Sequence, residues 1–173
     1  VIDHHRQTGE SFENPTLSYI EPFASSSCEM VAEILQYAGE EIHLKALESD
    51  ALYAGIMVDT NNFMNKPGVR TFEAVAFLRR CGADIIRIRK MFRSDISEYK
   101  VRAEAIQNTE IYLDAFAIAP CNADNCISPT IVGAKIADDL LDINGIKATF
   151  VLTSYEGKIY ISARSIDELN VQV

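Results

Sequence analysis

The chain has 173 residues, of which 48% are hydrophobic, and a formal net charge of −9. This length and composition predict a globular protein with one sizeable core, or a modest core and a small second domain. The acidic charge excludes a surface built for non-specific binding to duplex DNA, and no apolar stretch approaches the roughly 20 residues that a bilayer-spanning helix needs.

The first predicted element is a short strand at Val1 and Ile2, followed directly by Asp3, His4 and His5. Imidazole nitrogens bind transition metals, and a neighbouring carboxylate either binds the metal too or fixes the imidazole tautomer through its second nitrogen. This stretch therefore predicts metal-ligand chemistry at the end of a strand. The alternative is a polar N-terminal stub without a function.

A strand and a capped helix are predicted next. Residues 17–20 have the composition of a short strand. Ser26 and Glu29 have the spacing of a capping box, which predicts a helix over residues 26–38 that stops at Gly39.

Three further helices follow in the prediction. Apolar residues at helical spacing indicate a helix from residue 44 to about residue 58, so that Asp59 would leave its C-terminal end. Asp59 is either a ligand or an ordinary turn residue, because Asp and Asn favour such turns. Thr71 is predicted to cap a helix over residues 72–81, and residues 83–92 continue as a short helix.

A polar helical stretch at residues 94–107 is predicted to connect two domains, residues 1–93 and residues 108–173. After this connector the pattern changes to strands around one helix, which predicts a small α+β domain. The expected elements are a strand at 109–120, a helix at 130–143, and strands at 147–153 and 158–163 that form a hairpin.

Four segments carry a resemblance to a known family. They are residues 1–6 (Val-Ile-Asp-His-His-Arg), 25–29 (Ser-Ser-Ser-Cys-Glu), 52–60 (Leu-Tyr-Ala-Gly-Ile-Met-Val-Asp-Thr) and 161–165 (Ile-Ser-Ala-Arg-Ser). In this order they resemble the DHH/DHHA1 phosphoesterase family. Residues 59–72 most resemble the membrane-anchored, GdpP-type cyclic-di-AMP phosphodiesterases of Gram-positive bacteria.

The resemblance implies an α/β fold in two parts. The first is the C-terminal part of a Rossmann-like, helix-rich DHH domain, and the second is a truncated α+β DHHA1 domain that binds substrate. It also implies the cytoplasmic domain of a protein anchored in the bacterial cell membrane, and the four scattered cysteines fit reduced thiols in that compartment.

The activity that the resemblance implies is phosphodiester hydrolysis of cyclic-di-AMP, or of its linear product, by water activated at a two-metal site that would hold manganese. His4 and Asp59 would be metal ligands. His5 would face the scissile phosphate, with Asp3 orienting the pair. Arg164 would bind a substrate phosphate, although an exposed strand Arg without a partner would give the same sequence pattern.

Two more residues are candidates for substrate binding. Ser26 stands at a helix N-terminus, where free backbone N–H groups attract phosphate, but it most simply caps its helix. Asn62 either hydrogen-bonds a nucleotide or closes the turn after Asp59.

The family supplies further ligands from a His-x-x-x-Asp-x-Asp segment and another Asp that precede the Asp-His-His motif, and it has a Gly-Gly-Gly-His loop beyond the last strands. Two ligands alone cannot hold a two-metal cluster, so we expect the 173-residue chain to be inactive or nearly so by itself. Exposed apolar helix faces would also allow a homodimer.

Two alternatives remain open at this point. One is the oligoribonuclease and phosphoadenosine-phosphate phosphatase branch of the same superfamily, which would act on a short oligonucleotide. The other is a nucleic-acid-binding DHHA1 module, with Phe150, Tyr155 and Tyr160 as stacking platforms. The acidic charge weighs against this module, because Lys158 and Arg164 are nearly the only cations nearby.

Overall fold

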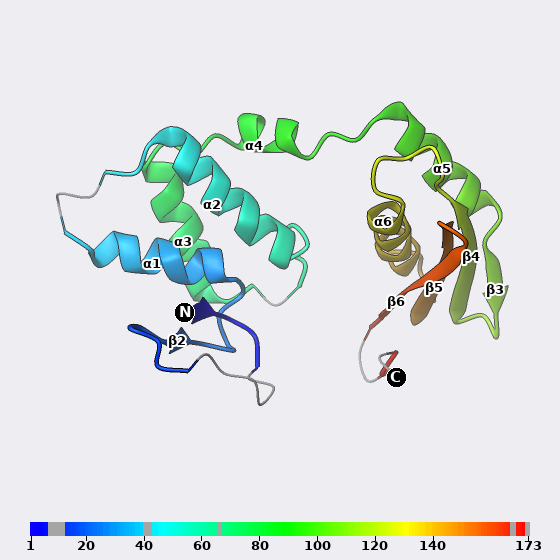
Figure 1. The fold of residues 1–173 in the computed structure, drawn as a ribbon, viewed down its shortest axis with the longest axis horizontal. Coiled ribbons are helices and arrows are strands. Elements are labelled where there is room, and N and C mark those ends of the chain that lie inside the picture. Colours follow the sequence, from blue (N-terminus) through cyan, green and yellow to red (C-terminus); the bar gives the residue numbers. More distant parts are fainter. Residues whose placement is uncertain (7–12, 40–42, 66, 167–168, 172–173) are drawn as a thin grey trace. The chain divides into compact units, whose positions relative to one another are not determined.

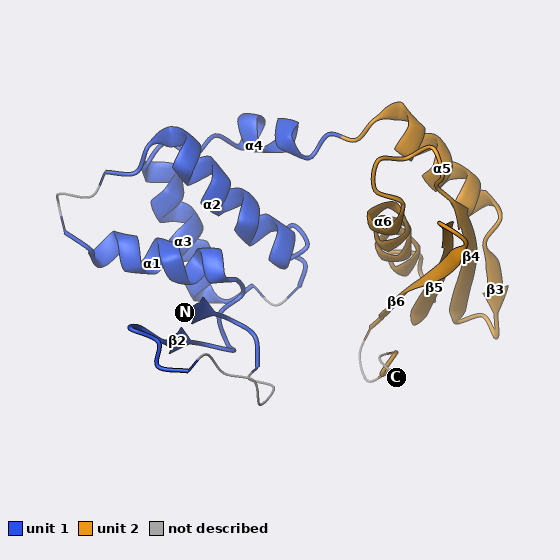
Figure 2. Cartoon of the chain, viewed as in Figure 1, with its two compact units in different colours: residues 1–93 blue, residues 94–173 orange. Residues whose placement is uncertain are grey.

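The computed structural model describes residues 1–6, 13–39, 43–65, 67–166 and 169–171. The chain forms two compact units, residues 1–93 and residues 94–173 (Figure 2). Each unit has a hydrophobic core of its own. The mixed α/β organisation predicted from the sequence is confirmed.

The first unit combines a small parallel sheet with four helices (Figure 1). Strand β1 (Ile2–Asp3) pairs in parallel with β2 (Tyr19–Ile20). Helices α1, α2 and α3 pack against one another, and α4 packs on α2. The helices are α1 (Ser27–Tyr37), α2 (Ala46–Asp59), α3 (Val69–Arg80) and α4 (Ile85–Met91).

The ends of α1 follow the sequence signals. The Ser26 hydroxyl accepts a hydrogen bond from the Glu29 N–H at 3.0 Å, which makes Ser26 the N-cap. After the C-cap Ala38, Gly39 has φ 96°, a left-handed conformation that glycine adopts without steric cost. In a full capping box the Glu29 carboxylate would accept from the Ser26 backbone N–H. Here it accepts from the side chains of Ser25 and Thr71 instead.

The predicted start of the third helix is wrong by three residues. Helix α3 begins at Val69 with Gly68 as N-cap, so Thr71 lies inside the first turn. Its hydroxyl accepts a hydrogen bond from the Gly68 N–H at 3.0 Å. A threonine that turns back to the cap residue gives a capping signal displaced from the true helix start.

The second unit is a four-stranded sheet with two helices. The strand order is β3-β4-β5-β6, in which β4 and β5 are parallel and the outer pairs are antiparallel. Helix α6 connects the parallel strands. The elements are α5 (Ile96–Gln107), β3 (Glu110–Tyr112), β4 (Phe116–Asn122), α6 (Pro129–Leu141), β5 (Ala148–Tyr155) and β6 (Lys158–Ser165).

The core of this unit lies between the sheet and its helices. Burial alternates along β4, so that Ala117, Ala119 and Cys121 are buried. Helix α6 contributes Ile136 and Leu140 to the same cluster. Residues 94–107, which the sequence analysis assigned to a connector, include α5, and this helix packs on β4 and α6 within the second unit.

The single strand predicted at 109–120 is wrong, because the segment is a hairpin of two strands. The chain reverses after β3, where Leu113 and Asp114 have φ of 51° and 54°. Apolar alternation runs through the turn and so does not reveal it. The second predicted hairpin is confirmed, with Glu156 and Gly157 at φ 50° and 71° joining β5 to β6.

Candidate metal site

The Asp3-His4-His5 stretch lies at the carboxyl end of β1. Parallel pairing with β2 places Asp3 opposite Ile20, and the Glu21 N–H donates to the Asp3 carbonyl at 3.0 Å. Side chains at the carboxyl ends of parallel strands are where α/β folds bind ligands. The strand pair therefore fixes the backbone from which both histidines extend.

Asp3 and His5 form a hydrogen-bonded pair. The Asp3 carboxylate accepts from His5 Nδ1 at 2.7 Å and from the His5 backbone N–H at 3.1 Å. The hydrogen bond from the His5 side chain is the main reason that the pKa of Asp3 lies below its usual range. A carboxylate that accepts from Nδ1 keeps the proton on that nitrogen, so Nε2 of neutral His5 is the free acceptor.

His4 faces a different carboxylate. His4 Nε2 lies 3.6 Å from Asp59 Oδ2, although 55 positions separate the two residues in the sequence. Asp59 is the last residue of α2, which agrees with its predicted place at the end of a helix. The helix stops because the chain then turns through three residues with positive φ, Asn61, Asn62 and Phe63.

Buried side chains stabilise the turn that follows Asp59. Thr60 is fully buried, and its hydroxyl donates to the Ile56 carbonyl at 2.6 Å while accepting from the Phe63 N–H at 3.0 Å. The Phe63 ring contacts Tyr53 and Phe72. Asp59 therefore projects from a helix end that these contacts hold in place.

The donor set of His4 and Asp59 fits a divalent first-row metal. Two donors 3.6 Å apart can both lie about 2.1 Å from one ion, the usual distance for nitrogen and carboxylate ligands of zinc. Asp3 accepts a hydrogen bond from His5 Nδ1 and is therefore placed to orient the His5 imidazole. Within the described ranges, no group of three or more His, Cys, Asp or Glu side chains has the geometry of a metal site.

The remaining candidates do not join this group through any described bond. Ser26 is buried and caps α1. Asn62 is exposed in the turn after α2, where its backbone N–H donates to the Met57 carbonyl at 2.8 Å. Arg164 in the second unit has a partner, since its Nε donates to Asp138 Oδ1 on α6 at 2.8 Å.

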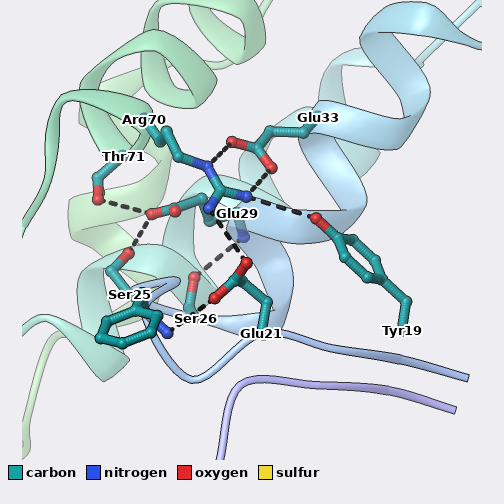
Figure 3. A network of polar contacts seen from close by, with 9 residues as sticks. Tyr19, Glu21, Ser25, Ser26, Glu29, Glu33, Arg70 and Thr71 are labelled. Atoms are coloured by element: carbon teal, nitrogen blue, oxygen red, sulfur yellow. Dashed lines mark hydrogen bonds and ion pairs between the residues drawn. The ribbon is translucent and has the colours of Figure 1, made fainter.

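A buried glutamate is a feature that the sequence analysis missed. Glu29 is 1% exposed, and its carboxylate accepts from the hydroxyls of Ser25 at 2.5 Å and Thr71 at 2.6 Å (Figure 3). These bonds join the start of α1 to the start of α3. The capping-box pattern includes Glu29, but the hydrogen bond from Thr71 to Glu29 could not be predicted from it.

Arg70 extends the same network to the sheet. It binds Glu33 of α1 through two hydrogen bonds of 2.7 Å, which raise its pKa above the usual range. Its guanidinium also lies 3.5 Å from the Tyr19 hydroxyl and 3.8 Å from Glu21 Oε2, on either side of Ile20 in β2 (Figure 3). Arg70 thus links α3, α1 and the strand that supports Asp3.

Comparison with known proteins identifies similar sequences. Residues 1–56 match the model of the DHH family, N-terminal domain. The similarity to curated relatives covers the whole chain at 40–42% identity. Residues 1–56 therefore belong to a DHH-family domain, and the chain as a whole is similar to these relatives.

The names of these curated relatives state an activity. The chain is 40% identical over 174 residues to the cyclic-di-AMP phosphodiesterase PdeA of Listeria monocytogenes. It is 42% identical over 174 residues to the cyclic-di-AMP phosphodiesterase GdpP of Geobacillus thermodenitrificans. Both matches cover 100% of this chain and 26% of the relative, so the chain spans about a quarter of the length of these proteins.

A solved structure shares the fold. The crystal structure of an exopolyphosphatase-related protein from Bacteroides fragilis matches with a TM-score of 0.79 and 20% identity. The match covers 96% of this chain and 50% of the other. Among the helices described for this chain, none combines the length and apolar character that crossing a membrane requires.

Proposed function

We propose that this chain carries part of the active site of a metal-dependent phosphodiesterase that hydrolyses cyclic-di-AMP. The observation that carries the proposal is the approach of His4 to Asp59 beside the Asp3–His5 pair. The names of the two relatives above supply the substrate class. Manganese is the metal implied by the family resemblance.

His4 and Asp59 would hold the metal ion. When bound, such an ion supplies a water molecule of lowered pKa and neutralises charge on phosphoryl oxygens. Their side chains are 18% and 38% exposed, which leaves the pair accessible while the backbone around it is fixed. Thr60 holds the helix end, and β2 holds the strand end.

His5 would contact the scissile phosphate or the leaving oxygen. Its side chain is 76% exposed, and Nδ1 is occupied by Asp3, so Nε2 is the atom available to substrate. Asp3 keeps the ring in one orientation and stabilises the protonated imidazole that would form if His5 accepts a proton. Arg164, Ser26 and Asn62 stay predictions as substrate contacts.

We also propose that the whole protein is anchored in the bacterial cell membrane, with this chain on its cytoplasmic side. The resemblance to membrane-anchored cyclic-di-AMP phosphodiesterases supports this placement. Separation of membrane and soluble fractions of cells that express the full-length protein would test it.

The substrate assignment is tested with the full-length protein in Mn²⁺. Hydrolysis of cyclic-di-AMP should exceed hydrolysis of the linear dinucleotide in kcat/KM. A linear dinucleotide that is cleaved faster would contradict the assignment and favour the oligoribonuclease branch of the superfamily. Cleavage of neither would contradict the proposed activity itself.

A further inference from the structure

Helices α1 and α2 make an unusually close contact at Gly55. A methyl group added at Gly55 would lie less than 3.0 Å from Cys28 Sγ, a separation that real Cβ atoms essentially never show. It would also lie 3.2 Å from the Cys28 Cβ. Gly55 stands inside α2, where glycine lowers helix stability relative to alanine, so the contact gives a packing reason for its presence.

This contact lies one helical turn before Asp59. Residues four positions apart share a helix face, so Gly55 and Asp59 lie on the same face of α2. Cys28 is half-buried, and the charge of Asp59 adds to burial in raising the pKa of its thiol. Cys28, Gly55 and Asp59 are therefore neighbours.

Helix α1 also contacts β1, the strand that leads to His4. One helix thus packs on both elements that carry the candidate ligands. A change in its distance from α2 at the Gly55 contact would alter how near Asp59 comes to His4, because closely packed interiors transmit a shift of a few tenths of an ångström. Asp59 Oδ2 and His4 Nε2 are 3.6 Å apart at this spacing.

We propose that Gly55 and Cys28 are positioning residues that set the spacing of the His4–Asp59 metal site. The proposal rests on the proposed function and deepens it, since it names the packing that brings the two ligands together. Gly55 lets the two helices approach because it has no side chain, and the volume of the Cys28 thiol limits how close they come.

The test is a double-mutant cycle in the full-length protein, with Mn²⁺ affinity measured from the electron paramagnetic resonance signal of free Mn²⁺. Gly55→Ala should weaken Mn²⁺ binding by about tenfold or more, the scale found when residues that support metal ligands are altered. Adding Cys28→Ala should restore affinity to within about threefold, because only the Cβ contact at 3.2 Å would remain.

Gly133 provides a matched control. A methyl group added there would overlap Thr153 Oγ1, an equally close contact between α6 and β5 that belongs to a different unit from His4 and Asp59. Gly133→Ala should lower the thermal midpoint while leaving Mn²⁺ affinity within about twofold of wild type. This comparison separates positioning of the metal site from general loss of stability.

The outcomes distinguish the inference from the proposed function. Wild-type protein that binds no Mn²⁺ would contradict the proposed function. Wild-type binding that Gly55→Ala leaves unchanged, or that Cys28→Ala does not restore, would overturn the inference. If Gly55→Ala does not fold, Cys28→Val overfills the same contact from α1, and unchanged Mn²⁺ affinity in that variant would overturn the inference as well.

Discussion

His4 and His5 are adjacent in the sequence but have different surroundings. The His4 side chain is 18% exposed and faces Asp59, whereas the His5 side chain is 76% exposed and is bound by Asp3. A shielded imidazole beside a carboxylate suits metal binding. An exposed imidazole with one nitrogen occupied suits contact with substrate, and we therefore propose different roles for the two residues.

Asp3→Asn tests the role assigned to the Asp3–His5 pair. Asparagine still offers an oxygen to His5 Nδ1 but lacks the charge that stabilises a protonated ring. We expect kcat for cyclic-di-AMP in the full-length protein to fall about 10- to 100-fold, the range found for groups that orient histidines. Steady-state kinetics measure the effect.

Glu13→Gln is the control, because it also removes a carboxylate charge, from an exposed residue. It should keep the wild-type kcat. An Asp3→Asn protein with wild-type turnover would show that the hydrogen bond does not support catalysis.

At the scale of elements, the buried Glu29 joins α1 to α3. Thr71→Val removes the hydroxyl that donates to this carboxylate at 2.6 Å and retains the shape of the side chain. The free energy of unfolding should fall by about 1–3 kcal/mol, because a buried acceptor loses a partner. Urea denaturation followed by circular dichroism measures the loss.

Thr130→Val is the matched control for this substitution, since Thr130 is an exposed residue near the start of α6. It should change stability by less than about 0.5 kcal/mol. Equal losses in the two variants would mean that the Thr71 hydroxyl has no special role in joining the helices.

The link between α2 and α4 predicts a dependence on pH. Arg87 Nε donates to Asp50 Oδ2 at 2.6 Å, and this side-chain hydrogen bond is the main cause that lowers the pKa of Asp50 from its ordinary 3.8. A carboxyl group with a lowered pKa in the folded state stabilises the fold above its ordinary pKa. That contribution is lost as the pH falls through the folded-state value.

Asp50→Asn should therefore lower the urea midpoint at neutral pH. The urea midpoint of the variant should also decline less steeply than that of wild type as the pH falls below 3.8. Urea titrations of wild type and variant across this range measure the difference. Asp124→Asn, at an exposed position, should keep the wild-type profile. An Asp50→Asn profile parallel to that of wild type would contradict the role of this ion pair.

Elements with local signals were predicted well from the sequence. Helix α1 has a cap at Ser26 and a stop at Gly39, and α6 has Ser128 before Pro129, so both were placed within two residues. The errors arose where local signals mislead. Thr71 resembles a cap because it bonds back to Gly68, and the turn at Leu113 interrupts a pattern that alternates on both sides.

At the scale of the whole molecule, the candidate site residues that the structure brings together are those in compact motifs. Asp3, His4 and His5 stand together, and Asp59 ends an apolar helix. The supporting contacts were not predictable in the same way. The bonds from Arg70 to Glu33 and from Thr71 to Glu29 join residues 37 and 42 positions apart, and only the packed fold shows that they meet.

We propose that His4 and Asp59 hold a catalytic metal ion. Mn²⁺ titration of the full-length protein, with cyclic-di-AMP hydrolysis measured on the same samples, tests it most directly. We predict stoichiometric Mn²⁺ binding and hydrolysis in wild type, and loss of both in His4→Ala and in Asp59→Ala. Variants that keep wild-type Mn²⁺ affinity and turnover would contradict the claim.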